Sequence, residues 1–272
     1  LSPPIWNAYP PPEVFGIVFN SDEEKARQLI TVNYQLIASE LSELGINVNC
    51  APVIDLSEKR GHSVIGDRAL SSNPETVGLL GKAVIDGLEK GGVSGIIKHI
   101  PGHGRAEVDS HKRLPKIDSC LEDLSSREFN PFIQLRFAAA AMTGHLLFPK
   151  LDLKHPVTFS GKIINEIIRN LIKFEGLLLS DDLSMNALSG SIDNRYIKAL
   201  EAGCDIGLHC NGNITEMELI AKACPGIKDA AKSRIKVFLK KVADVSDNRE
   251  IPDINELKAS LREGLKGFFN VM

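Results

Sequence analysis

The sequence predicts an α/β protein built on a parallel β-sheet. Short apolar runs alternate along the chain with longer amphipathic segments of helical period. Polar residues also gather where each apolar run ends, as they do at the carboxyl edge of a parallel sheet. The five runs of this kind predict either an open doubly wound sheet or a (β/α) barrel whose first strands are absent from this chain.

The expected elements are placed by their hydrophobic period and by the glycines and prolines that separate them. The C-terminal part should be helical, apart from a loop over 240–252. In chain order, the other expected elements are helix 22–43, strand 46–56 running into a loop from Pro52 to Asp55, helix 73–90, strand 93–100, helix 121–139, strand 139–148, helix 161–173, strand 176–183, helix 193–202 and strand 204–210.

Several of these helices begin at residues that typically cap a helix. Ser21, with Glu24 three residues later, predicts a capping box at the start of the first helix. Asn73 precedes a proline in first-turn position, and Ser160 precedes a later helix. The proline-rich lead over 1–12 should run extended, because proline fixes φ and restricts the residue before it.

Composition and charge exclude some classes of protein. The 272 residues carry 32 Lys and Arg against 35 Asp and Glu, a net charge of −3. There is no basic excess to hold nucleic acid or an anionic membrane. No apolar run is long enough to predict a membrane span. The length suits one large α/β unit, so we expect a single domain over 1–272.

The five cysteines are scattered and stand mostly in apolar runs. Without a C-x-x-C pair, a zinc ribbon or a thioredoxin-type redox site is not expected. We expect reduced core residues of a cytosolic protein. They are Cys50, Cys120, Cys204, Cys210 and Cys224.

The most informative segment is KHIPGHGRAEVDSHKRLP, residues 98–115. Lys98 and His99 stand at a predicted strand end. Asp109 and His111 are two apart on a loop, so the carboxylate can hydrogen-bond one nitrogen of the imidazole. Such a pair is a proton shuttle that can protonate a leaving oxygen and later deprotonate water.

Two other interpretations of this segment stay open. The three histidines His99, His103 and His111 could hold a metal ion, or they could be structural loop residues. Their spacing matches neither H-E-x-x-H nor H-x-x-E-H, which argues against the metal.

The segment LLLSDDLSM, residues 177–185, places two adjacent carboxylates at the end of an apolar strand. Asp181 is the better candidate for a nucleophile, because a strand end holds a carboxylate rigidly. Asp182 is expected to cap the following helix or to play a similar structural part.

Two further residues stand near predicted strand ends. Arg68, in the segment VIGDRAL, could clamp ligand hydroxyls through its planar guanidinium, although a surface ion pair with Asp67 is an equal alternative. His145 could line a pocket, but a structural histidine with satisfied ring nitrogens is at least as good an interpretation.

Five motifs occur in order between residue 1 and about residue 215. They are A-P-V-I-D-L, I-G-D-R, K-H-I-P-G-H-G, D-S-H and S-D-D-L-S-M. This set closely resembles the bacterial β-N-acetylglucosaminidases of glycoside hydrolase family 3, in the branch that recycles cell wall. Five motifs in register are far more specific than any one of them.

The resemblance implies a role for each matching residue. Asp181 would be the nucleophile that forms a covalent glycosyl-enzyme, with retention at the anomeric carbon. His111, paired with Asp109, would be the general acid/base, where most retaining glycosidases use a second carboxylate. The residues that would bind the sugar hydroxyls are Arg68, Lys98 and His99.

The resemblance also implies a substrate and a setting. The substrate would be a small carbohydrate, β-1,4-linked N-acetylglucosamine on an anhydro-muropeptide from peptidoglycan recycling. The enzyme would be a cytoplasmic monomer that uses no cofactor or metal and binds neither nucleic acid nor membrane.

The chain departs from the family pattern at its start. Family members carry about three more strands and a D-Q-E-G-G-R segment upstream, so we expect a (β/α)8 TIM barrel that lacks roughly its first three strands. Asp67 also replaces the glutamate that is more usual before the arginine. The alternatives to an active glycosidase are an inactive truncated barrel and a metal-dependent hydrolase built on the histidine cluster.

Overall fold

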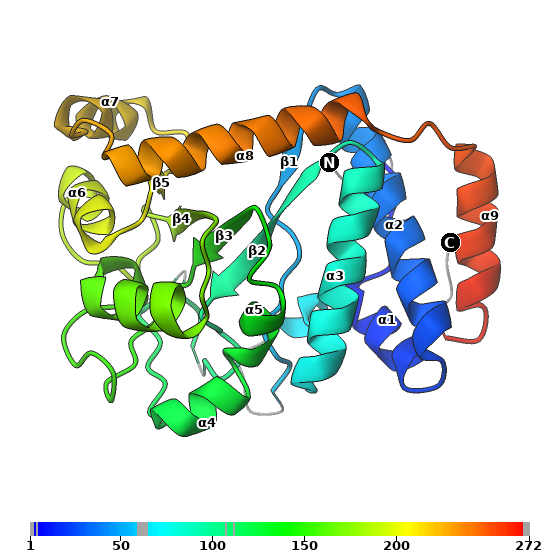
Figure 1. Ribbon diagram of the computed structural model, residues 1–272, viewed down its shortest axis with the longest axis horizontal. Coiled ribbons are helices and arrows are strands. Elements are labelled where there is room, and N and C mark those ends of the chain that lie inside the picture. Colours follow the sequence, from blue (N-terminus) through cyan, green and yellow to red (C-terminus); the bar gives the residue numbers. More distant parts are fainter. Residues whose placement is uncertain (1–2, 4, 59–64, 107, 111, 269–272) are drawn as a thin grey trace.

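The computed structural model describes residues 3, 5–58, 65–106, 108–110 and 112–268. Its centre is a curled sheet of parallel strands in the order β1-β2-β3-β4-β5 (Figure 1). A doubly wound sheet would place strands on both sides of the first one, whereas barrel strands follow one another in chain order. The predicted parallel α/β fold is therefore confirmed in its barrel-type form. The strands are β1 (Val48–Asn49), β2 (Ser94–Ile100), β3 (Ala140–Thr143), β4 (Leu177–Asp182) and β5 (Ile206–Leu208).

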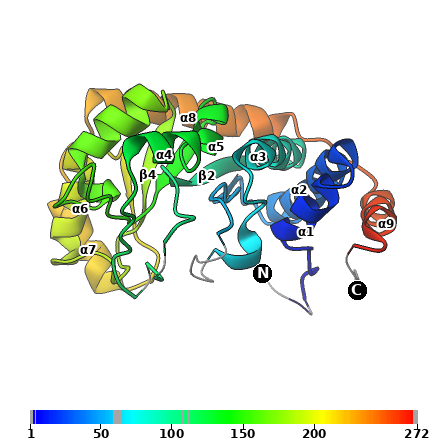
Figure 2. The same cartoon turned by 90° about the horizontal axis from the view of Figure 1, so that it is seen from below.

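Helices cover the sheet and flank it at both ends (Figures 1 and 2). Among the described residues they are α1 (Pro12–Phe19), α2 (Glu23–Glu43), η1 (Gly66–Arg68), α3 (Pro74–Lys90), α4 (Leu121–Ser126), α5 (Asn130–Gln134), η2 (Val157–Phe159), η3 (Ile163–Leu171), α6 (Ile192–Ala202), α7 (Ile214–Ala223), α8 (Asp229–Asp247) and α9 (Ile254–Leu265). Within the described ranges, none of the helices has the length and apolar character needed to cross a bilayer.

The strands bury side chains on both faces, as expected for a parallel sheet. On one face, the strand residues Ile97, Ala141 and Leu178 join the main core with the helices. On the other face, a second apolar cluster forms under α8 and contains Ile96, Ala140, Met142, Leu177, Leu179, Phe238 and Val242.

Helix α8 crosses the molecule from the α6–α7 end to the α3 end (Figure 1). Its Phe238 and Val242 supply the helix side of the second cluster. Near its start, Arg234 binds the buried carboxylate of Asp205 with two nitrogens at 2.7 and 2.8 Å. The predicted loop over 240–252 is wrong for residues 240–247, because apolar residues four apart continue the helical stripe.

Two predictions for the first helices are wrong in detail. Asp22, one residue later than the expected capping box, caps α2 by accepting the Lys25 amide at 3.0 Å. Glu24 instead bonds Gln28 along the helix surface. The proline-rich lead does not stay extended to its end, because Pro12 is the first residue of α1.

Two other predicted elements are interrupted near a proline. The strand expected over 46–56, with its loop from Pro52 to Asp55, is paired at β1 and at a bridge through Val53. The helix expected over 121–139 is broken into α4 and α5, and α5 has Pro131 in its first turn. The caps at Asn73 and Ser160 are confirmed.

The prediction of core cysteines is correct only for Cys204, which is buried. Cys50, Cys120, Cys210 and Cys224 are exposed. Each of these four stands at the end or start of an element, so the apolar run beside it is buried while the cysteine itself is not.

Candidate active site

The residues singled out from the sequence come from several turns at one edge of the sheet. Lys98 and His99 lie near the end of β2, and Asp181 lies near the end of β4. Because the strands are parallel, these ends meet at the carboxyl edge, where (β/α) barrels carry out their chemistry.

Asp181 is held as a carboxylate. Burial by itself would raise the pKa of Asp181. The nearby charges of His99, His145 and Lys98 outweigh burial, and the Asp182 amide adds a hydrogen bond of 2.8 Å. Together they keep the pKa of Asp181 below its ordinary value, so the group is ionised near neutral pH, as a nucleophile must be.

Asp182 has a different task from its neighbour. One of its oxygens accepts the amides of Ser184 at 3.0 Å and of Cys210 at 3.1 Å. The other accepts the Ser184 hydroxyl at 2.6 Å. No helix begins directly after β4, so Asp182 plays the similar structural part that was expected as the alternative to a helix cap. It ties the turn after β4 to the end of β5, which leaves Asp181 as the carboxylate available for chemistry.

Asp55 is the site residue that sequence reasoning missed. Its side chain is fully buried just after the Val53 bridge. It accepts hydrogen bonds from the ring Nδ1 of His99 at 2.6 Å and from the backbone amide of His103 at 2.7 Å. Burial would raise the pKa of Asp55, but His99 and His103 outweigh it and lower that pKa. Its only signal in the sequence was its place at the end of the apolar run A-P-V-I-D-L.

His103 continues this network into the following loop. Its Nε2 lies 3.4 Å from the hydroxyl of Ser110, whereas Nδ1 is buried without a hydrogen-bond partner among the described residues. Burial lowers the pKa of His103 to about 4. Gly104 follows, where an added Cβ would lie 2.4 Å from the carbonyl oxygen of Leu56. Only glycine allows the two loops to approach so closely.

His145 is fully buried, and both of its ring nitrogens have partners. Nδ1 lies 2.8 Å from the Thr158 hydroxyl, and Nε2 lies 3.0 Å from the carbonyl oxygen of Asp182. Burial lowers the pKa of His145. This geometry agrees with the structural interpretation of His145, although its position next to Asp181 gives it an electrostatic effect on the site.

The remaining predicted residues lie on loops at the same edge. Asp109 is half-buried on the loop after β2, and Arg68 is half-buried in η1, on the segment after β1. His111 lies outside the described residues, so its predicted pairing with Asp109 stays a prediction. Among the residues that the structure describes, no three His, Cys, Asp or Glu side chains gather as metal ligands would. The His99/His103/His111 alternative includes His111 and is not tested by this.

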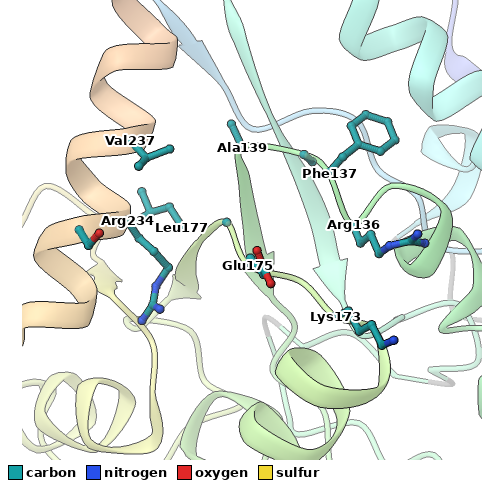
Figure 3. Close-up of a pocket in the computed structure, with 11 residues that line it drawn as sticks. Arg136, Phe137, Ala139, Lys173, Glu175, Leu177, Arg234 and Val237 are labelled. Atoms are coloured by element: carbon teal, nitrogen blue, oxygen red, sulfur yellow. The ribbon is translucent and has the colours of Figure 1, made fainter.

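A cavity of about 670 Å³ lies elsewhere, at the opposite edge of the sheet (Figure 3). Leu177 and Ala139 line it from the beginnings of β4 and β3, and Arg234 and Val237 line it from α8. It is an amino-terminal cavity, remote from the strand ends that carry Lys98 and Asp181. We therefore place the active site by its chemistry and not by this cavity.

Comparison with known proteins identifies the class. Residues 8–245 match the description "Glycosyl hydrolase family 3 N terminal domain". The chain belongs to this family.

Named relatives narrow the class. A β-hexosaminidase of Pseudomonas aeruginosa is 36% identical over 245 residues, which cover 89% of this chain and 73% of that protein. A β-hexosaminidase of Chromobacterium violaceum is 35% identical over 261 residues, which cover 93% of this chain and 72% of that protein. The protein is thus a glycoside hydrolase of the β-hexosaminidase type.

Two solved structures of similar fold come from the same type of enzyme. NagZ from Neisseria gonorrhoeae, in complex with N-trifluoroacetyl-D-glucosamine, superposes with a TM-score of 0.82 at 31% identity, covering 95% of this chain and 76% of that one. A family 3 β-N-acetylglucosaminidase from Paenibacillus sp. superposes with a TM-score of 0.79 at 29% identity, covering 93% of this chain and 51% of that one.

Proposed function

We propose that this protein is a retaining glycosidase that removes non-reducing β-1,4-linked N-acetylglucosamine from anhydro-muropeptides through a covalent glycosyl-enzyme. The observation that carries the proposal is the position of Asp181 at the carboxyl edge of the sheet, where His99, His145 and Lys98 keep its pKa below the ordinary value. A carboxylate held this way is unprotonated near neutral pH and can attack an anomeric carbon.

The proposed reaction has two displacements. A carboxylate oxygen of Asp181 bonds to the anomeric carbon as the glycosidic C–O bond breaks, and His111, oriented by Asp109, gives its proton to the leaving oxygen. Water then attacks the same carbon, His111 takes back a proton, and Asp181 leaves. Two inversions restore the β configuration. The residues proposed to bind the sugar hydroxyls are Arg68, Lys98 and His99.

The substrate proposal rests on the relatives. The relatives from Pseudomonas aeruginosa and Chromobacterium violaceum are named β-hexosaminidases, and the NagZ structure from Neisseria gonorrhoeae is a complex with N-trifluoroacetyl-D-glucosamine. An anhydro-muropeptide offers this sugar at its non-reducing end. The scattered, odd set of cysteines supports a reducing compartment, so we place the enzyme in the cytoplasm as a monomer. Cell fractionation and sedimentation test these two points.

The adjacent carboxylates provide a matched test of the nucleophile. Asp181→Asn should lower kcat on a nitrophenyl β-N-acetylglucosaminide by more than about 10³-fold, because an amide cannot attack the anomeric carbon. Asp182→Asn is the control, since an asparagine oxygen can still accept the amides of Ser184 and Cys210. Comparable turnover by Asp181→Asn and the wild type would refute the assignment. Release of the α-anomer as first product, seen by NMR, would refute retention.

A further inference from the structure

The carboxylate of Asp55 is fully buried, which is unfavourable for a charged group. Asp55 lies beside the proposed reaction centre, but it does not contact the substrate in the proposed mechanism. Moving a carboxylate out of water costs several kcal/mol unless strong donors replace the solvent. Here the donors are the Nδ1 of His99 at 2.6 Å and the amides of His99 and His103. The ring contact is the shortest of these hydrogen bonds, as expected when the acceptor carries a charge.

The Asp55–His99 contact determines which ring nitrogen of His99 is available. An ionised Asp55 can only accept, so Nδ1 of His99 must carry a hydrogen and donate it. That leaves Nε2 as the nitrogen for a ligand. The same carboxylate holds the backbone at the end of β2 and at the start of the next loop, because it also accepts both amides.

We propose that Asp55 is a positioning residue for the glycosidase reaction: it fixes the ring orientation and tautomer of His99, and through His99 it acts on the nucleophile Asp181. This inference rests on the proposed function. His99 is among the neighbours whose electrostatic interaction lowers the pKa of Asp181, so the ring that Asp55 holds lies close to the nucleophile.

Titratable groups from every strand end lie around Asp181, and the proposal has to be tested against all of them. They are Lys98 from β2, His103 from the loop after β2, His145 from the segment after β3, Asp182 from β4, Cys50 from the segment after β1 and Cys210 from the segment after β5. An Asp55 variant also changes His103 directly, because Asp55 accepts the His103 amide and its charge raises the pKa of His103. The tautomer of His99 is therefore the readout that isolates the Asp55–His99 contact.

Asp55→Asn separates the positioning role from a merely structural one. The asparagine oxygen can still accept the His103 amide, but the Nδ2 group now faces Nδ1 of His99 and donates to it. His99 is then forced to carry its hydrogen on Nε2. The same exchange in the His–Asp pair of the serine proteases, which leaves the geometry intact, lowers kcat by about 10⁴-fold through the wrong tautomer.

The first arm of the test needs no catalysis. Long-range ¹H–¹⁵N NMR on histidine-labelled protein should show the His99 hydrogen on Nδ1 in the wild type and on Nε2 in Asp55→Asn. A wild type with hydrogen on Nε2 alone would overturn the proposal, and so would an unchanged tautomer in the variant. This arm stands even if the variant folds poorly, because the wild-type spectrum alone can refute the contact.

The second arm measures kcat and KM against pH on the nitrophenyl substrate. Asp55→Asn should lower kcat by about 10² to 10⁴-fold, because His99 then presents the wrong ring nitrogen to the site. The matched control is Asp205→Asn, a buried aspartate at the opposite edge, which should lower Tm and leave kcat within about threefold of wild type. A kcat of Asp55→Asn within about threefold of wild type overturns the positioning role.

The two arms also separate this inference from the proposed function. A wild-type protein that releases no nitrophenol refutes the glycosidase proposal and the kinetic role of Asp55 with it. The tautomer measurement tests the Asp55–His99 contact independently of that result.

Discussion

The buried imidazole of His103 makes the stability of this protein depend on pH in a way that can be calculated. Burial lowers the pKa of His103 to about 4, from the ordinary 6.5. Between these values the unfolded chain binds a proton that the folded chain does not, so stability falls as pH falls. The stability that the neutral ring provides is fully present above about pH 6.5, and it is lost as the pH falls to about 4.

The size of the effect follows from the shift. A difference of about 2.5 pKa units corresponds to about 3 kcal/mol when the whole range is crossed. Between about pH 7 and pH 5, the same linkage removes about 2 kcal/mol of the free energy of unfolding. His103→Gln keeps a donor near the Ser110 hydroxyl but cannot titrate, so it should lack this loss.

The assay is urea unfolding of wild type and variant at the two pH values, with circular dichroism as the probe. The quantity compared is the change in the free energy of unfolding with pH, because groups common to both proteins cancel in that difference. His155→Gln, at an exposed histidine, is the control and should titrate like the wild type. Equal pH dependence in wild type and His103→Gln would refute the buried, neutral state of His103.

Two predictions concern the architecture around the site, each measured by urea unfolding. Arg234→Met should lower the free energy of unfolding by about 3 kcal/mol, because the buried carboxylate of Asp205 loses the hydrogen bonds from two Arg234 nitrogens. The control is Lys232→Met at an exposed position of α8, which should lower the free energy of unfolding by less than about 0.5 kcal/mol. Equal losses in the two variants would show that the Arg234–Asp205 pair does not anchor α8. Gly104→Ala should cost about 2 kcal/mol, because its Cβ would lie 2.4 Å from the carbonyl oxygen of Leu56. An unchanged midpoint would mean that the loop can move aside.

The strands that carry the site could be predicted because the signals that mark them are local in sequence. The runs that end at His99 and Asp181 are apolar, continuous and bounded by glycine or polar residues, and a parallel strand buried on both faces needs no more than that. Proline limited the prediction of one helix. Pro131 lies inside a segment whose apolar pattern continues through it, and the backbone does not follow the pattern there.

Asp55 could not be identified as a site residue from the sequence, for a different reason. Its partners His99 and His103 are 44 and 48 positions away. An aspartate at a strand end looks the same whether it faces water, caps a turn or receives a buried imidazole. The distinction depends on which strand end lies beside it, and the pairing of strands sets that.

The sequence by itself determined the α/β class, the positions of the strands along the chain and the residue types at their carboxyl ends, because hydrophobic period and glycine or proline breaks act over a few residues. The order of the strands within the sheet came from the structure. The tertiary structure decided which of those residues act together. It assigned Asp182 to the turn after β4 and left Asp181 among the cations, and it placed Asp55 under His99. The physical reason is that burial and neighbouring charge set the ionisation of a carboxylate, and both come from segments far apart in the chain.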